Sequence, residues 1–351
     1  MGVIEVYLAL IIFSYIALGI KTVQGKRKYV IFSLSVLLII VCLRDFSVGA
    51  DIPGYLSAFE KMRDYGLKEM LANAFSKKDP VYYISGWLFS KLFYSFRLWI
   101  TFIAALYFFA VGKLIISESE IPLISIIAFI CLGDFAFSLS ALRQVIALSF
   151  VILSYPFLKS KKYLKFILLV IIASLFHQTA IVFLIAIPFS KMKPGIIHFA
   201  IITVSVVTVL FFKTQFLNLL SALIDVSRYQ NYLSNNASVL SISGFVIKSV
   251  VFIYALTYSR QLCAKKPTDL IFFNLYFLGV VLQLFSVIIA EMFRVSMYFS
   301  VFGLILLADA SVCEKKSNVR ILLQILLVTF LLIYFFKDGI FPYRFFFTET
   351  K

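Results

Sequence analysis

Residues 161–191 read KKYLKFILLVIIASLFHQTAIVFLIAIPFSK, an apolar run with basic residues at both ends and Phe176-His177-Gln178-Thr179 near its middle. Lys/Arg clusters between apolar segments mark the cytoplasmic side of a membrane protein. Because about 20 apolar residues span the bilayer once, this run has to cross twice to leave Lys165 and Lys191 on the same side. The sequence therefore predicts two short helices that meet near His177 at the outer face.

The composition of the whole chain requires lipid as its main solvent. Hydrophobic residues make up 62% of the 351 residues and charged residues 14%, against about 25% charged in an ordinary globular chain. No polar block is long enough for a soluble domain, so residues 1–351 are predicted to form a single membrane domain. The net charge of +16 lies largely in short clusters between apolar runs, so it indicates membrane topology and not a nucleic-acid partner.

The remaining apolar runs predict an all-α, polytopic bundle of about twelve spanning helices, with both termini outside. An odd number of apolar segments separates the basic cluster of Lys26, Arg27 and Lys28 from Lys159, all expected in the cytoplasm, so one segment does not cross. Residues 81–96 are short and contain Lys91, and we assign them as a re-entrant or interfacial helix. The spans predicted besides the two halves of 161–190 are 3–20, 29–43, 98–116, 121–139, 141–158, 196–212, 241–259, 268–289, 296–312 and 319–336.

This topology gathers most polar residues without a topogenic role on the outer face. The two long polar stretches, 44–80 and 213–240, are both predicted to be outer loops that contribute to a site. The first opens with LRDFSVGADIPGY (residues 43–55), whose glycines and proline indicate a tight, irregular backbone. Arg44 could bind a phosphate and Asp45 or Asp51 could act as a base, whereas the alternative is that Arg44 and Asp45 pair and anchor a helix end.

Arg143 and His177 are the most informative polar residues. Arg143 begins an apolar helix outside any basic cluster, and a guanidinium at a helix N-terminus suits a phosphate. With the adjacent Gln144 it is a candidate substrate contact. His177 is costly in lipid and suits general-base work or a hydrogen bond to a sugar hydroxyl, the alternative being a bond to a neighbouring helix.

Further candidate contacts lie along the rest of the chain. Glu291 and Arg294 are spaced for an i, i+3 pair between two predicted spans. Four cysteines without metal-ligand spacing and only two histidines predict no metal site. The other candidates, polar or aromatic side chains suited to sugars, are Arg228, Tyr229, Tyr232, Tyr55 and Tyr343.

Taken together, the motifs LRDFSVGADIPGY, ALRQVIA, ASLFHQTAIVFL and RYQNY, with PY in the tail, resemble the EpsG-like branch of the Wzy polysaccharide polymerases. Their order, spacing and hydropathy match along nearly the whole chain. The sequence departs from the family pattern at Asp79-Pro80, where the family often has a glutamate followed by glycine. Asp79 stands in for that glutamate with a shorter reach, which leaves its role open.

The resemblance implies a glycosyltransferase of the bacterial inner membrane with its active site facing the periplasm or cell exterior. Such enzymes join undecaprenyl-diphosphate-linked oligosaccharide repeat units, both donor and acceptor, into O-antigen, capsular or exopolysaccharide. No cofactor and no metal is implied, and a chain-length regulator protein is a candidate partner besides membrane lipids. In this scheme Arg143 and Arg294 bind diphosphate, with Arg44 next and Arg228 as an additional or acceptor-side contact. His177 is the first candidate base.

Other classes of membrane protein remain as alternatives. An O-antigen ligase uses the same donor with another acceptor. A flippase or other transporter of lipid-linked saccharide would place polar residues through the whole membrane depth. A membrane acyltransferase could use the intramembrane His177, but nothing else in the sequence supports an acyl donor.

Overall fold

The computed structural model describes residues 2–18, 20, 22–223, 238–266, 268–337 and 342–347. These residues form helices and no β-strand, with one isolated bridge between Arg44 and Phe345, which confirms the all-α prediction. The chain divides into two compact units, Met1–Leu184 with Glu314–Lys351, and Ile185–Cys313, which we describe separately. The prediction of a single domain stays a prediction.

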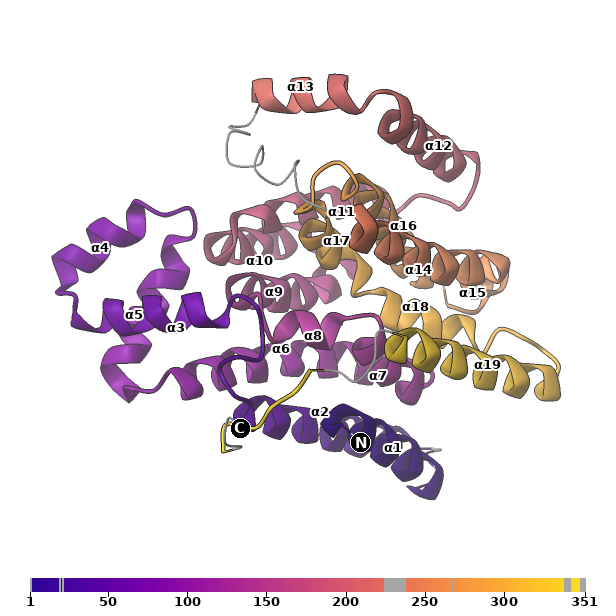
Figure 1. The fold of residues 1–351 in the computed structure, drawn as a ribbon. Coiled ribbons are helices and arrows are strands. Elements are labelled where there is room, and N and C mark those ends of the chain that lie inside the picture. The colour runs from indigo at the N-terminus through magenta and orange to yellow at the C-terminus, as the bar shows by residue number, and fades with distance from the viewer. Residues whose placement is uncertain are drawn as a thin grey trace. The chain divides into compact units, whose positions relative to one another are not determined.

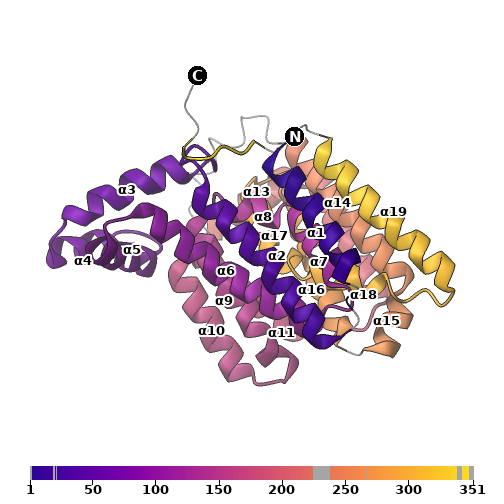
Figure 2. The same ribbon diagram turned by 90° about the horizontal axis from the view of Figure 1, so that it is seen from below.

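The first unit contains the first ten α-helices, the start of a 3-10 helix and the last helix (Figures 1 and 2). Within it, α6 packs against α2 and α9, and α10 packs against α9. Its helices are α1 (Val3–Leu18), α2 (Val23–Leu43), α3 (Ile52–Asp64), α4 (Leu67–Phe75), α5 (Pro80–Phe93), α6 (Phe96–Glu118), α7 (Pro122–Cys131), α8 (Asp134–Ser138), α9 (Leu142–Lys159), α10 (Tyr163–Phe176), η1 (Gln178–Ile185) and α19 (Ser317–Phe336).

The second unit is built around α16, which packs against α12, α14, α17 and α18. Its helices are α11 (Ala186–Phe189), α12 (Ile196–Phe211), α13 (Lys213–Leu223), α14 (Ser238–Thr257), α15 (Ser259–Lys265), α16 (Asp269–Phe285), α17 (Met292–Ser300) and α18 (Gly303–Ala310).

In the described part of the chain, three helices are by length and composition apolar enough to cross a membrane: α6, α9 and α19. The number rises to five if two bent pairs each count as one span, α14 with α15 (bent by 63°) and α17 with α18 (47°). These five agree with predicted spans. Shorter apolar helices occupy the other predicted positions except 29–43, which lies in the longer helix α2, and α2 is not among the candidate spans. The number of about twelve crossings is not confirmed by the structure.

The predicted helix break at His177 is present. The first helix of the 161–190 run, α10, ends at Phe176, His177 is extended (φ −153°), and η1 begins at Gln178. A second break was not predicted: Gly133 has φ +93°, a left-handed conformation that cannot continue an α-helix. The predicted span 121–139 is therefore wrong as one helix and divides into α7 and α8.

Within the predicted outer loop 44–80 the structure forms two helices that the sequence did not predict, α3 and α4. Met62, Met70 and Ala74 form a small buried core there, with partly buried aromatic residues packed on it. Pro53 lies in the first turn of α3, where its fixed φ favours a helix start. In the other predicted loop, 213–240, α13 covers Lys213–Leu223, and residues 224–237 lie outside the described part.

One end of the first unit, which we call the site end, joins the C-termini of α2 and α10 to the N-termini of α5 and α9. There Arg44 donates to the Leu139 carbonyl (2.6 Å), and Asp79 contacts both Arg143 and His177. These residues come from widely separated parts of the sequence and were all predicted to lie on the outer side of the membrane. In the structure they meet at the same end of the first unit.

The opposite end, which we call the basic end, holds residues predicted to be cytoplasmic. Lys26 at the start of α2 donates to the Glu120 carbonyl (2.9 Å), just after α6. Lys159 at the end of α9 binds both oxygens of Glu118 at 2.8 and 3.0 Å. The first unit thus separates topogenic cations from the candidate site by the length of its helices.

Candidate active site

The site is centred on an ion pair between Arg143 and Asp79. Arg143 Nη1 lies 2.7 Å from Asp79 Oδ2, and the two side chains are 32% and 3% exposed. Arg143 projects from the first turn of α9, and Asp79 directly precedes Pro80, which starts α5. A carboxylate so buried is stable in its charged form only with partners, and Arg143 supplies the cation.

His177 contacts the same carboxylate from the end of α10. Its Nδ1 is 3.3 Å from Asp79 Oδ2, and the Gln178 amide donates to Asp79 Oδ1 at 3.0 Å. The break between α10 and η1 therefore presents a ring nitrogen and a backbone N–H together. When Nδ1–H donates to the carboxylate, Nε2 of a neutral imidazole carries the lone pair that can accept a proton.

The charge state of Asp79 follows from these donors. Burial raises the pKa of this carboxyl, but the hydrogen bond and charge of His177, the Gln178 amide and the Arg143 charge together lower the pKa below its ordinary value of 3.8. Asp79 is thus ionised at neutral pH. An anion shared by an arginine and a histidine is the arrangement that orients an imidazole as a base.

Tyr55 extends the site from α3. Its hydroxyl accepts from Arg143 Nε at 3.3 Å, and the guanidinium lies 5.8 Å from the centre of its ring. Burial raises the pKa of Tyr55, so the phenol stays protonated, although the Arg143 charge opposes the rise. Among the described residues Arg143 hydrogen-bonds through Nε and Nη1, which leaves Nη2 for a ligand. The adjacent Gln144 is buried in α9 at 1% exposed.

Arg44 lies in the interior of the site end. Its side chain is fully buried, and Nη1 donates to the carbonyls of Leu139 (2.6 Å) and Val48 (3.4 Å). Gly49, with φ +111°, lies against the same Leu139 carbonyl, where a Cβ would clash. The tight backbone predicted at Gly49 is thus confirmed. Arg44 does not form the ion pair with Asp45 that was the alternative to phosphate binding, and instead holds the start of the 44–51 turn against α8.

Tyr343 and Arg97 also bind backbone at the end of α2. The Tyr343 hydroxyl donates to the Ile40 carbonyl, and Arg97 Nη1 donates to the carbonyls of Cys42 (2.7 Å) and Arg44 (2.8 Å). Arg97 was not singled out from the sequence, since it looks like a cation at a helix start. These contacts attach the C-terminal segment to α2, so Tyr343 is a positioning residue in this structure.

The two predicted alternative bases lie at the edge of the site. Asp45 Oδ1 accepts from the Ser47 amide at 2.9 Å, and hydrogen bonds from Ser47 lower the pKa of this largely solvent-facing carboxyl. Asp51 stands at the start of α3, where its carbonyl accepts from the Tyr55 amide at 3.2 Å. His177 is instead bound by Asp79, whose role the sequence left open. The signal in the sequence was a carboxylate directly before a proline and an apolar helix.

The remaining predicted residues do not fall in the first unit. Glu291 and Arg294 lie at the start of α17 in the second unit, joined by a backbone hydrogen bond from the Arg294 amide (2.9 Å). Arg228, Tyr229 and Tyr232 lie outside the described residues. Among the residues that are described, no group of three His, Cys, Asp or Glu side chains is arranged to hold a metal ion.

The chain matches a known family of proteins. The EpsG family model matches residues 27–345, nearly the whole chain. No curated protein and no solved structure matches. The matched range contains every residue of the Arg143–Asp79–His177 cluster. The chain therefore belongs to the EpsG family.

Proposed function

We propose that this membrane protein is a polysaccharide polymerase that joins undecaprenyl-diphosphate-linked oligosaccharide repeat units on the outer face of the bacterial inner membrane. Family membership supports a polymerase of the polysaccharide type. The observation that carries the chemistry is the buried Asp79 carboxylate, which contacts both Arg143 and His177.

The reaction needs a base and a cation, and the cluster offers both. His177 Nε2 accepts the proton of the acceptor hydroxyl, whose oxygen then attacks the anomeric carbon of the donor sugar. The bond between that carbon and the diphosphate oxygen breaks, and its electron pair leaves with the diphosphate. Arg143 stabilises the charge that develops there, which lowers the barrier because the interaction is strongest in the transition state.

Substrate contacts beyond this cluster are assigned by position. Tyr55 flanks Arg143 and is a proposed sugar or diphosphate contact, and Asp51 borders the same surface through its place one turn before Tyr55. Gln144 is 1% exposed, so it is proposed to support the start of α9 and not to touch the substrate. Arg294 in the second unit is proposed as a further diphosphate ligand from its sequence position. Arg44, being fully buried against backbone carbonyls, is proposed to position the site rather than touch the substrate.

The proposed topology has about twelve crossings, with both termini and the site end outside. The separation of the site end from the basic end in the first unit supports this orientation. Lys26 and Lys159 lie at one end, and Arg143 lies at the start of α9, whose last turn contains Lys159.

The test is polymerisation by the purified full-length protein in proteoliposomes. The substrate is the lipid-linked repeat unit extracted from host cells that lack this protein, and the product is read as a ladder on a gel. We expect the wild type to produce a ladder. An O-antigen ligase would produce none in this assay, because its separate acceptor is missing. No ladder from folded protein, with the lipid-linked substrate recovered intact, would contradict the polymerase proposal.

The two histidines of the chain form a matched pair of variants. His177→Gln should lower the initial rate by roughly 10²–10⁴-fold, because glutamine can donate to Asp79 but cannot take a proton. His198→Gln should keep the wild-type rate, since His198 binds Asn274 (2.9 Å) inside the second unit and glutamine can keep that bond. A wild-type rate from His177→Gln would refute the assignment of the base.

Arg143 has its own test by a conservative change. Arg143→Lys keeps the charge but loses the planar fork that serves Asp79, Tyr55 and a phosphate at once. We expect it to be as inactive as Arg143→Ala in the ladder assay. Full activity of the lysine variant would mean that Arg143 provides a charge and no directed hydrogen bonds.

A further inference from the structure

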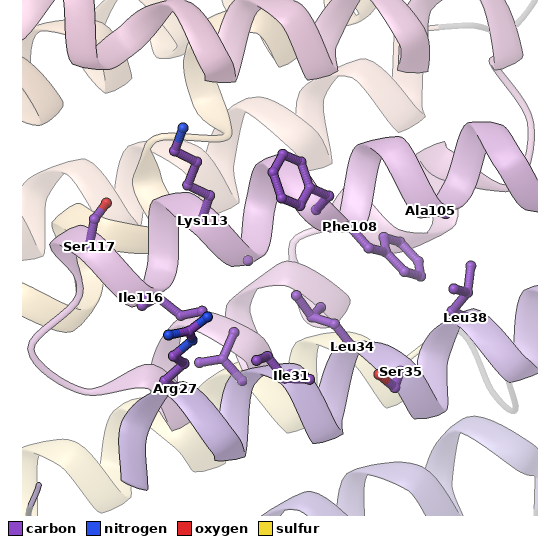
Figure 3. A pocket seen from close by; sticks show the side chains of 13 residues that line it. Arg27, Ile31, Leu34, Ser35, Leu38, Ala105, Phe108, Lys113, Ile116 and Ser117 are labelled. Carbon is purple, nitrogen blue, oxygen red and sulfur yellow. The ribbon is translucent and has the colours of Figure 1, made fainter. Parts of the chain in front are cut away.

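A groove runs between α2 and α6 in the first unit, apart from the candidate active site. Its volume is about 450 Å³, within the range of about 300–1,000 Å³ typical of small-molecule sites. Leu34 and Leu38 on α2 and Ala105 and Phe108 on α6 give it apolar walls, as Figure 3 shows. Such walls suit a hydrocarbon chain.

Two cations stand at one end of this groove. Arg27 extends across it toward Ile116 on α6. Lys113 also lines this end, but in Figure 3 its ammonium points away from Arg27. In the described part of the chain neither side chain has a hydrogen-bond or ion-pair partner, whereas the neighbouring Lys26 is bound to the Glu120 carbonyl. A lysine stem of four carbons lets the Lys113 ammonium turn toward an anion beside Arg27.

The length of the groove matches one leaflet of a bilayer. Its lining runs along α2 from Arg27 to Leu38, or about 16 Å at 1.5 Å per residue. Along α6 it runs from Ser117 to Ala105, or about 18 Å. The hydrocarbon core of a bilayer is about 30 Å thick, so the groove covers about half of it, with the cations at the headgroup end.

We propose that this groove is a binding site for one phospholipid with an anionic headgroup, drawn from the leaflet at the basic end. The headgroup phosphate binds Arg27, with Lys113 as the second cation, and one acyl chain lies along Leu34, Leu38 and Phe108. The site is separate from the lipid-linked saccharide, whose diphosphate belongs at the site end, and it does not depend on the polymerase proposal. That the basic end faces the cytoplasm follows from the predicted topology.

A cavity in the described part of the second unit offers a comparison for this site. It has a volume of about 190 Å³, lies within the second unit among α12, α14 and α16, and its walls are almost wholly apolar. No charged residue lines it, so nothing there identifies an occupant. The groove in the first unit differs in combining an apolar length with cations at one end only.

The experiment is a lipid titration of the purified full-length protein in a non-ionic detergent, followed by native mass spectrometry. Phosphatidylglycerol is compared with phosphatidylcholine of the same acyl chains, and inorganic phosphate serves as the free anion. We expect saturable binding of one phosphatidylglycerol, weaker binding of phosphatidylcholine, and no protection from thermal unfolding by phosphate alone. No saccharide is present, so failure of the polymerase assay leaves this result unaffected.

Variants separate the headgroup from the chain. Each cation near an anionic headgroup contributes a factor of about 5 in affinity, so Arg27→Gln with Lys113→Gln should weaken phosphatidylglycerol binding roughly 30-fold, and phosphatidylcholine binding by less, because its phosphate also meets Arg27 but its headgroup carries no net charge. Ala105→Phe fills the far end of the groove and should weaken the binding of both lipids. The cation variant and Ala105→Phe both change side chains that are at least partly exposed, so the fold should persist.

The control removes two exposed basic charges that do not line the groove, Lys28→Gln with Lys162→Gln. It should bind phosphatidylglycerol as the wild type does. The proposal is overturned if the Arg27 and Lys113 variant keeps wild-type affinity, if the control loses as much, or if phosphatidylcholine binds as tightly as phosphatidylglycerol. In any of these cases the two cations serve only to orient the chain in the membrane.

Discussion

Replacing Asp79 with asparagine tests whether one carboxylate holds both the arginine and the histidine of the site. Asparagine keeps the size of the side chain but loses its charge. Its Nδ2 is itself a hydrogen-bond donor and would face the donors that Asp79 now accepts from. Removing one partner of a buried ion pair costs about 3–5 kcal/mol. Because the Arg143 side chain is 32% exposed, water recovers part of that cost, and we expect the free energy of unfolding to fall by about 2–3 kcal/mol.

The effect on catalysis should exceed the effect on stability. Asp79 fixes His177 through Nδ1, so its loss permits the tautomer in which Nε2 carries the proton and cannot act as a base. We expect the initial rate of polymerisation to fall by roughly 10²–10⁴-fold. The assay is the ladder in proteoliposomes, with thermal unfolding of the same preparation as the measure of folded protein.

Asp79→Glu is the matched control, since glutamate keeps the charge with a longer reach. It should retain a larger part of the rate than Asp79→Asn. If Asp79→Asn is destabilised but polymerises at the wild-type rate, the carboxylate is purely structural and the proposed mechanism is wrong. If it is neither destabilised nor slowed, the ion pair itself contributes nothing measurable.

Four further outcomes follow from the same contacts. Arg44→Met removes the donor to the Leu139 carbonyl and should lower the free energy of unfolding by about 1–3 kcal/mol. The rate of polymerisation per folded molecule should stay near that of the wild type. Lost polymerisation with unchanged stability would instead mean that Arg44 binds the substrate. Because the pKa of Asp79 is lowered by folding, its carboxylate stabilises the protein above pH 3.8, the ordinary pKa, and this stabilisation is lost as the pH falls through the lowered pKa. Thermal scans between about pH 5 and 3 should therefore show a larger fall in melting temperature for the wild type than for Asp79→Asn. Equal dependence of the two melting temperatures on pH would contradict this. The ladder should persist in EDTA, because Arg143 meets the diphosphate charge, and its loss and recovery with added metal would refute this. Rates of Arg143→Ala, His177→Ala and the double variant should be non-additive, since both residues share Asp79; strict additivity would show independent roles.

The sequence predicts the parts of this fold that membrane insertion controls. The clusters around Lys165 and Lys191 required a double crossing, and the structure breaks the helix at His177. The same reasoning placed Lys26 and Lys159 opposite Arg143, and the first unit has this separation. Charge placement relative to the bilayer is a strong constraint, because a misplaced cation is costly in lipid.

Contacts between distant helices could not be predicted from a single sequence. Asp79 is 64 residues from Arg143 and 98 from His177, and no local pattern shows which helices bring them together. Arg44 at a membrane edge looks the same in sequence whether it binds a phosphate or, as here, the Leu139 carbonyl. The helices α3 and α4 were missed because their apolar residues are too few to resemble a span, although they suffice for packing on α5.

The position of Asp79 between two potential cations suggests why a polymerase would pair its diphosphate ligand with a carboxylate. In the structure Asp79 offsets much of the Arg143 charge, which in the proposed mechanism would weaken binding of the substrate diphosphate in the ground state. In that mechanism His177 becomes a second cation beside Asp79 Oδ2 when it takes the proton of the acceptor hydroxyl, and the two cations then share the carboxylate. Asp79 would then neutralise less of the Arg143 charge at the moment when negative charge develops on the leaving diphosphate. The proposed mechanism thus couples proton transfer to leaving-group stabilisation through one carboxylate and directs binding energy to the transition state.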